Sequence, residues 1–86
     1  MSNEEVINKI NHFFVEEFEA EESSLIPIEN MRKTLDLDSL DFVDLVVVVE
    51  SNFGFKVKPE DFQNIVSFQD FYDYVIANVK AEEVKA

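Results

Sequence analysis

The chain has 86 residues, of which 47% are hydrophobic, so it can form one domain with a modest hydrophobic core. Nineteen acidic residues against seven basic ones give a formal net charge of -12, which repels nucleic acid phosphates and anionic lipid headgroups, so we expect neither nucleic acid binding nor membrane insertion. The absence of cysteine excludes disulfides, thiolate metal sites and a cysteine nucleophile.

The composition favours helices over short strands. One glycine and two prolines leave few sites for tight turns, whereas nine phenylalanines supply large side chains for a core. The first residues show no basic segment followed by an apolar one, and no apolar run reaches the ~20 residues needed to span a bilayer. We expect a monomeric, cytoplasmic protein that forms a single domain over residues 1–86, with frayed ends at residues 1–2 and 81–86.

The first expected helix begins at the N-terminus. Ser2 followed by Glu5 has the spacing of a capping box, in which side chains satisfy free backbone N–H groups at a helix start. Apolar residues then recur at helical spacing, and they are Val6, Ile7, Ile10, Phe13, Phe14 and Phe18. We therefore predict an amphipathic helix that ends near Phe18.

Residues 19–38 show no long helical or strand period, so we predict a long loop with a short turn near residues 29–33. A loop this long is uncommon in a compact domain. Its apolar side chains could pack it onto the helices, and they are Leu25, Ile26, Ile28, Met31, Leu35 and Leu37. We expect a packed loop and not a linker.

A second helix is predicted from Asp38 or Ser39 to about Asn52. Four consecutive valines in this segment would suit a strand, but β-branching lowers helix propensity only slightly. Asp38 and Ser39 are both good N-cap residues, and Gly54 stands where a helix C-cap needs glycine. The segment is also long for a strand.

Two further helices complete the expected fold. Proline at position 59 opens a brief third helix that includes Phe62 and Ile65. Ser67 with Asp70 then opens a last helix, whose apolar stripe is Phe68, Phe71, Tyr72, Val75, Ile76 and Val79. The sequence thus predicts an all-α protein, a four-helix bundle with a long first loop and a short third helix.

The acidic residues around position 40 do not form a calcium loop. Such a loop needs oxygen ligands at alternate positions, a central glycine and a terminal glutamate. Here Leu40, Asp41 and Val47 occupy the fifth, glycine and last positions. We therefore expect no metal site.

The segment Asp38-Ser39-Leu40-Asp41 could simply be a helix start, but the chain around it resembles the acyl carrier protein family. The defining motif of that family is Asp-Ser-Leu followed by an acidic residue at the head of the second helix. The resemblance extends from residue 31 to about residue 79 and more loosely over the first predicted helix. The residues that carry it include Leu35, Glu50, Phe53, Pro59-Glu60-Asp61, Ile65 and Ser67-Phe68-Gln69. One departure is Asp36, where the family usually has glycine.

The resemblance implies that Ser39 carries a 4'-phosphopantetheine arm taken from coenzyme A, with Asp38 and Leu40 beside it. A separate phosphopantetheinyl transferase (holo-carrier synthase) would attach the arm, whose thiol would carry acyl groups as thioesters. Catalysis would then belong to partner enzymes of the acyltransferase and ketosynthase type, and the chain itself would not be an enzyme. Transient complexes of this kind suit encounters steered by charge.

The second predicted helix offers a docking surface for basic patches on such partners. Leu40, Val43 and Val47 recur at helical spacing and would form an apolar strip. The acidic residues that flank it are Asp41, Asp44 and Glu50. If the valines were all core residues, this surface would not exist. Because the helix is apolar on almost every side and a small bundle covers only one face, we expect some valines to be exposed.

The opposite face of the same helix would join a core that receives the acyl chain, as the resemblance implies. The residues expected there are Val46, Val49, Val57, Phe62 and Ile65. Phe62 stands where the family often has a smaller residue, so we expect a short cavity.

The sequence alone leaves two other functions open. The chain could be an aminoacyl or peptidyl carrier of a specialised pathway, although its acidity favours fatty acyl or polyketide work. It could also be an unmodified acidic module that only binds proteins.

Overall fold

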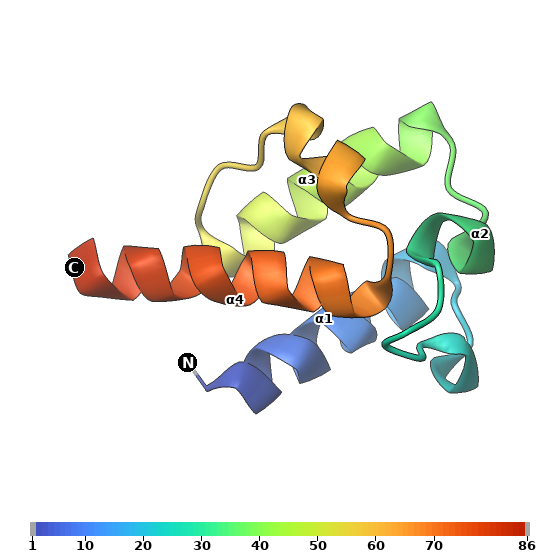
Figure 1. Ribbon diagram of the computed structural model, residues 1–86, viewed down its shortest axis with the longest axis horizontal. Helices are drawn as coiled ribbons and strands as arrows, with labels where there is room; N and C mark the ends of the chain where they lie inside the picture. The colour runs from blue at the N-terminus through green and yellow to red at the C-terminus, as the bar shows by residue number, and fades with distance from the viewer. Residues whose placement is uncertain (1, 86) are drawn as a thin grey trace.

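The computed structural model describes residues 2–85, and it confirms the predicted all-α fold. These residues form α1 (Asn3–Phe18), η1 (Glu22–Ser24), α2 (Met31–Leu35), α3 (Ser39–Phe53), η2 (Pro59–Asn64) and α4 (Phe68–Lys85), where η marks a 3-10 helix. In Figure 1, α4 runs along the molecule, with α1 below it and α3 and η2 above it. Within the described range, none of the helices is both long and apolar enough to cross a membrane.

The helix α1 has the predicted ends. The Ser2 side chain accepts a hydrogen bond from the backbone N–H of Glu5 at 3.2 Å, as the capping spacing indicated. At the other end Glu19 adopts a left-handed conformation (φ 55°), and the N–H of Ala20 returns to the carbonyl of Phe14 at 3.1 Å. Most of the predicted apolar stripe is buried in the core, namely Val6, Ile10, Phe13 and Phe14.

The long loop is held by backbone hydrogen bonds as well as by apolar side chains. The N–H of Met31 donates to the carbonyl of Val66 at 2.9 Å, and the N–H of Gln69 donates to the carbonyl of Pro27 at 2.9 Å. These bonds attach the loop to Val66, just before α4, and to the first turn of α4. Where a short turn was expected near residues 29–33, the chain forms the five-residue helix α2.

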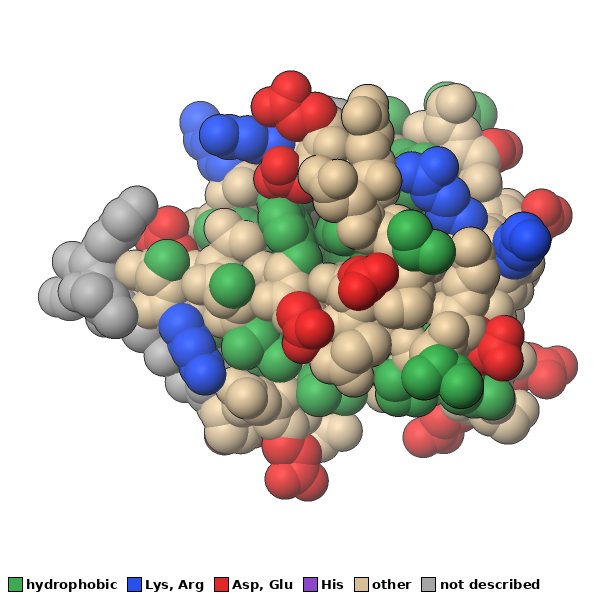
Figure 2. Space-filling model, viewed as in Figure 1, with side chains coloured by type: hydrophobic (Ala, Val, Ile, Leu, Met, Phe, Trp, Pro, Cys, Tyr) green, Lys and Arg blue, Asp and Glu red, His purple; other side chains and the backbone are tan. Residues whose placement is uncertain are grey.

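Four of the six apolar side chains that could pack the loop do so, including Leu35 and Leu37, and two do not. Leu25 and Met31 are buried, but Ile26 is 45% exposed and Ile28 is 85% exposed. Figure 2 shows hydrophobic side chains gathered at the lower right, where this loop lies in Figure 1. Because the backbone bonds hold the loop, it does not need these two side chains as anchors.

The helix α3 forms despite its four valines. The N-cap is Asp38, and Gly54 ends the helix in a left-handed conformation (φ 78°), with its N–H bonded to the carbonyl of Glu50 at 2.9 Å. Leu45 and Val49 are fully buried against the bundle. Tertiary packing therefore outweighs the weak strand preference of the valines.

The predicted third helix is a 3-10 helix, and Ile65 is its C-cap and not part of it. Runs of this tighter helix are usually short, as this six-residue one is. The last helix, α4, opens with the predicted capping box: the N–H of Asp70 donates to the Ser67 hydroxyl oxygen, and the N–H of Ser67 donates to the Asp70 carboxylate, both at 3.1 Å. The α4 helix continues to Lys85.

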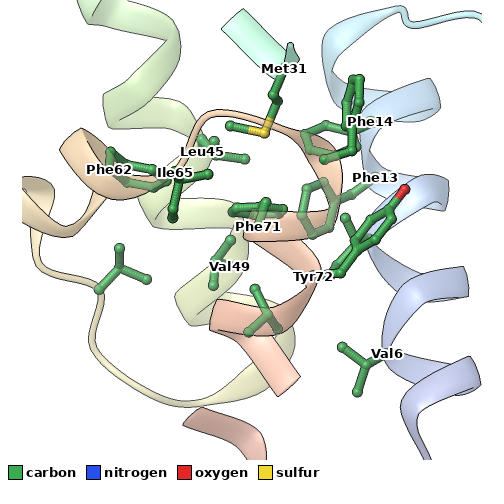
Figure 3. Close-up of a cluster of buried hydrophobic side chains, with 14 of the residues drawn as sticks. Val6, Phe13, Phe14, Met31, Leu45, Val49, Phe62, Ile65, Phe71 and Tyr72 are labelled. Atoms are coloured by element: carbon green, nitrogen blue, oxygen red, sulfur yellow. The ribbon is translucent and has the colours of Figure 1, made fainter. Parts of the chain in front are cut away.

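The core is built around aromatic rings from three elements. Figure 3 shows Phe71 of α4 between Phe13 and Phe14 of α1 on one side and Phe62 of η2 on the other. The Phe71 ring centroid lies 5.6 Å from that of Phe14, and it stacks on Phe62 at 6.4 Å with an interplanar angle of 17°. Phe62 therefore joins η2 to the centre of the bundle, next to α3.

Candidate functional site

The motif at the head of α3 forms a closed capping box. The Asp38 carboxylate accepts a hydrogen bond from the N–H of Asp41 at 2.9 Å, and the Asp41 carboxylate accepts one from the N–H of Asp38 at 3.1 Å. Both acidic side chains of the motif thus have a structural task. They also stabilise the start of α3, because negative charge is favourable at the positive end of the helix dipole.

Ser39 is the first residue of α3, and its side chain is exposed. Of the two N-cap candidates considered for α3, only Asp38 serves. The geometry reflects the backbone: Asp38 has the extended conformation that a cap requires, whereas Ser39 already lies within the helix. The Ser39 hydroxyl is therefore not needed to cap the helix, and it faces solvent at the helix start.

Asp36 shows why a glycine would suit its position. This residue ends α2 in a left-handed conformation (φ 51°), and its N–H bonds to the carbonyl of Arg32. Glycine adopts this conformation without steric cost, and aspartate is among the few other residues that tolerate it. The backbone needed before the motif is thus present without the glycine.

A groove of about 270 Å³ lies beside Ser39, between α2, α3 and η2. Its lining residues are Arg32, Ser39, Phe42, Val43, Val46 and Phe62. Apart from Ser39 and the Arg32 guanidinium, the walls are apolar side chains. Among these residues Ser39 is exposed, whereas Phe62 is only 3% exposed.

Two hydrogen bonds hold η2, and with it Phe62, against the groove. The Arg32 guanidinium donates to the carbonyl of Phe62 at 3.1 Å, and the Tyr74 hydroxyl donates to the Asp61 carboxylate at 2.9 Å. Burial of Tyr74, together with the bond to Asp61 and its negative charge, raises the pKa of the Tyr74 phenol to about 12. This tyrosine therefore keeps its proton and its bond at neutral pH.

The residues expected around an acyl chain are brought together only in part. Val46 and Phe62 line the groove, whereas Val49, Val57 and Ile65 are buried in the core and are not among the lining residues. The function of these five residues stays a prediction.

The exposed strip on α3 has the expected apolar residues. Leu40 is 75% exposed, Val43 61% and Val47 58%, so these side chains are not core residues. Asp44 is exposed beside them, and Asp41 and Glu50 are half-buried. We call Leu40, Asp41, Val43, Asp44, Val47 and Glu50 the α3 surface. That partners dock on this surface stays a prediction.

Sequence reasoning missed Arg32 and Phe42, which complete the groove. The Arg32 Cζ lies 4.8 Å from the centroid of the Phe42 ring, and that ring lies 5.4 Å from the ring of Phe62. The sequence did hold one indication of Arg32: Arg32 and Lys33 are the only lysine or arginine residues between Lys9 and Lys56. No group of three or more potential metal-ligating side chains occurs within the described part of the chain.

Comparison with known proteins agrees with the site. The family model described as "Phosphopantetheine attachment site" matches residues 7–75. An acyl carrier protein from Rubrobacter xylanophilus is 31% identical over 81 residues, which cover 94% of this chain and all of that protein. Another, from Thermotoga maritima, is 35% identical over 74 residues, which cover 86% of this chain and 91% of that one. A third, from Lactobacillus acidophilus, is 31% identical over 75 residues, which cover 87% and 94%.

The match to residues 7–75 spans the motif, the groove and at least part of every helix, so it concerns most of the domain and not a short segment. It also confirms the expected cofactor, phosphopantetheine. The chain belongs to the acyl carrier protein family.

Proposed function

We propose that this chain carries acyl groups as thioesters on a 4'-phosphopantetheine arm attached to the Ser39 oxygen. The observation that carries the proposal is the state of the Ser39 hydroxyl, which is exposed at the first position of α3 and has no capping task. It also opens onto the apolar groove. An exposed hydroxyl beside a groove fits a covalent arm that must be attached by another protein.

The other serines fit this role less well. Ser2 and Ser67 accept hydrogen bonds as helix caps, and Ser24 is half-buried. Ser23 lies in η1 and Ser51 lies near the end of α3, so neither stands at the start of an α-helix. Ser39 alone combines exposure, a helix start and the neighbouring groove.

In the proposed attachment, the Ser39 oxygen attacks the pantetheine-bearing phosphorus of coenzyme A. A new P–O bond forms, the bond to 3',5'-ADP breaks, and the hydroxyl proton passes to a base on the transferase. The attached arm supplies the thiol that a chain without cysteine lacks. The chain itself only presents the arm, and catalysis belongs to its partners.

The α3 surface is proposed as the place where these partners dock. Its apolar residues are exposed and its acidic residues complement basic patches, as expected for a transferase, an acyltransferase or a ketosynthase-type enzyme. The net charge of -12 would steer such encounters without a large interface. The acidity favours fatty acyl or polyketide cargo over aminoacyl cargo. A cytoplasmic location and a monomeric state stay predictions.

The test is intact-protein mass spectrometry after incubation with coenzyme A and a broad-specificity phosphopantetheinyl transferase. We expect the parent to gain one phosphopantetheine, Ser39→Ala to gain none, and Ser51→Ala to behave as the parent. Circular dichroism would show that each variant is folded. A gain on folded Ser39→Ala would move the site elsewhere, and no gain on the parent would favour an unmodified interaction module.

A further inference from the structure

The groove beside Ser39 combines one cation with apolar walls, in a region that is otherwise negative. Arg32 is the only charged residue among the six that line it. The surrounding segment, residues 36–44, carries four aspartates. A phosphodiester attached at Ser39 would add another negative charge beside these carboxylates. Salt screens the repulsion between neighbouring charges only partly.

The Arg32 side chain is held in place before any ligand arrives. It donates from Nη2 to the carbonyl of Phe62 at 3.1 Å, and its Cζ lies 4.8 Å from the centroid of the Phe42 ring. A guanidinium has five N–H donors, so this bond leaves others available. Because the side chain is partly ordered, a further contact costs less conformational entropy.

We propose that Arg32 binds the phosphodiester of the arm on Ser39, and that Phe42, Val43 and Val46 contact the apolar, dimethyl-bearing part of the arm that follows the phosphate. This inference rests on the proposed attachment at Ser39. The chemistry of the groove matches that of the arm: the cation and the attachment serine line the same groove, and its remaining walls are apolar. Charge complementarity and continuity with the attachment residue identify the arm as the occupant.

Such a contact would hold only the near end of the arm. The thiol end would stay free to reach the active sites of partner enzymes. The binding would also offset the repulsion from Asp38 and Asp41, whose carboxylates are fixed in the capping box. Arg32 would thus act as a cofactor-binding residue, in addition to its contacts with Phe42 and Phe62.

The experiment compares the phosphopantetheinylated forms of the parent, Arg32→Gln, Arg32→Lys and the matched control Lys33→Gln. Lys33 is the neighbouring exposed cation and is not among the lining residues, so its loss changes the net charge equally. Mass spectrometry first establishes that each form carries the arm. The readouts are the ³¹P resonance of the phosphodiester and the nuclear Overhauser effects between Arg32 and the first methylene of the arm, with the ³¹P shift of the same protein in urea as reference.

We expect the parent and Lys33→Gln to share a ³¹P shift displaced from the urea value. Arg32→Gln should move most of the way to that value, and Arg32→Lys should lie between, since lysine keeps the charge but not the planar fork. Identical shifts for folded parent and Arg32→Gln would overturn the proposal even if all forms carry the arm. If Arg32→Gln does not fold, the measurement on the parent protein tests the proposal. Absence of Overhauser effects between Arg32 and the arm would then overturn the proposal. Effects from Arg32 to the thiol end of the arm alone would overturn it as well, because they would place the far end of the arm in the groove.

Discussion

Asp38 and Asp41 cap each other's backbone at the head of α3, through hydrogen bonds of 2.9 and 3.1 Å. Ser39, which lies between them, is thereby free of this task. We predict that Asp38→Ala lowers the free energy of unfolding by about 1 kcal/mol, as loss of an N-cap usually does. Ser39→Ala should change it by less than ~0.5 kcal/mol, as exposed substitutions generally do. Urea denaturation of both variants measures the difference. Equal losses for the two variants would mean that the serine shares the capping.

Two left-handed residues should respond in opposite directions to substitution. Gly54 has a φ of 78°, and a Cβ added there would meet no atom within 4 Å, so only the backbone conformation opposes it. We predict that Gly54→Ala costs about 1 kcal/mol of stability. Asp36, with a φ of 51°, already bears that strain, so Asp36→Gly should leave stability unchanged or raise it slightly. Thermal or urea unfolding tests both, and a clear loss for Asp36→Gly would show that its side chain has a further stabilising role.

Phe62 anchors η2 to the core, and its truncation should be costly. The side chain is 3% exposed and contacts the rings of Phe42 and Phe71. We predict that Phe62→Ala lowers the free energy of unfolding by ~3–5 kcal/mol and enlarges the groove toward the core. Val47→Ala, at a 58% exposed site on the same bundle, is the control and should cost little. Unfolding of both variants at the same denaturant concentration as the parent would place Phe62 outside the core.

Charge reversal on the α3 surface should slow modification without unfolding the protein. We predict that Asp44→Lys, and likewise Glu50→Lys, lowers the rate of phosphopantetheine transfer at low salt by about fivefold, the size of one exposed charge interaction. Glu16→Lys, at an exposed site on α1, makes the same change in net charge away from this surface and should have a smaller effect. The measurement is the initial rate at low and high salt. Equal rates for Asp44→Lys and Glu16→Lys would argue against docking on α3.

The raised pKa of Tyr74 predicts a loss of stability in strong base. The phenol has a pKa of about 12 in the folded protein, compared with the ordinary tyrosine pKa of 10.0. The folded state therefore holds this proton more tightly, so the stabilisation is complete below pH 10 and is lost as the pH rises from 10 through 12. Tyr74→Phe should show a flatter dependence in this window, measured by urea denaturation at each pH.

Absorbance titration gives a direct check of the same pKa. In Tyr72→Phe, Tyr74 is the only tyrosine, so its ionisation is read without overlap. Ionisation near pH 10 in the folded variant would contradict both the burial of Tyr74 and its hydrogen bond to Asp61.

The capping residues and the apolar periodicity determined the positions of the main helices. Ser2, Gly54 and the pair Ser67 and Asp70 mark their ends in the sequence, and each acts there in the structure. Such signals are local, because a cap acts on backbone groups within one helical turn. The Asp38-Ser39 motif is local in the same way, so the candidate attachment residue was accessible from the sequence.

The groove was decided only by the tertiary structure. Arg32 and Phe62 are 30 residues apart, and their hydrogen bond exists because backbone bonds hold the long loop against Val66 and the first turn of α4. The exposure of Ile26 and Ile28 has the same origin, since those bonds replace the side-chain packing that the apolar pattern indicated. Periodicity along a chain records which residues share a helix face, but it does not record which distant backbone groups meet. The hydrogen bond from the Arg32 guanidinium to the distant Phe62 carbonyl is a contact of that second kind.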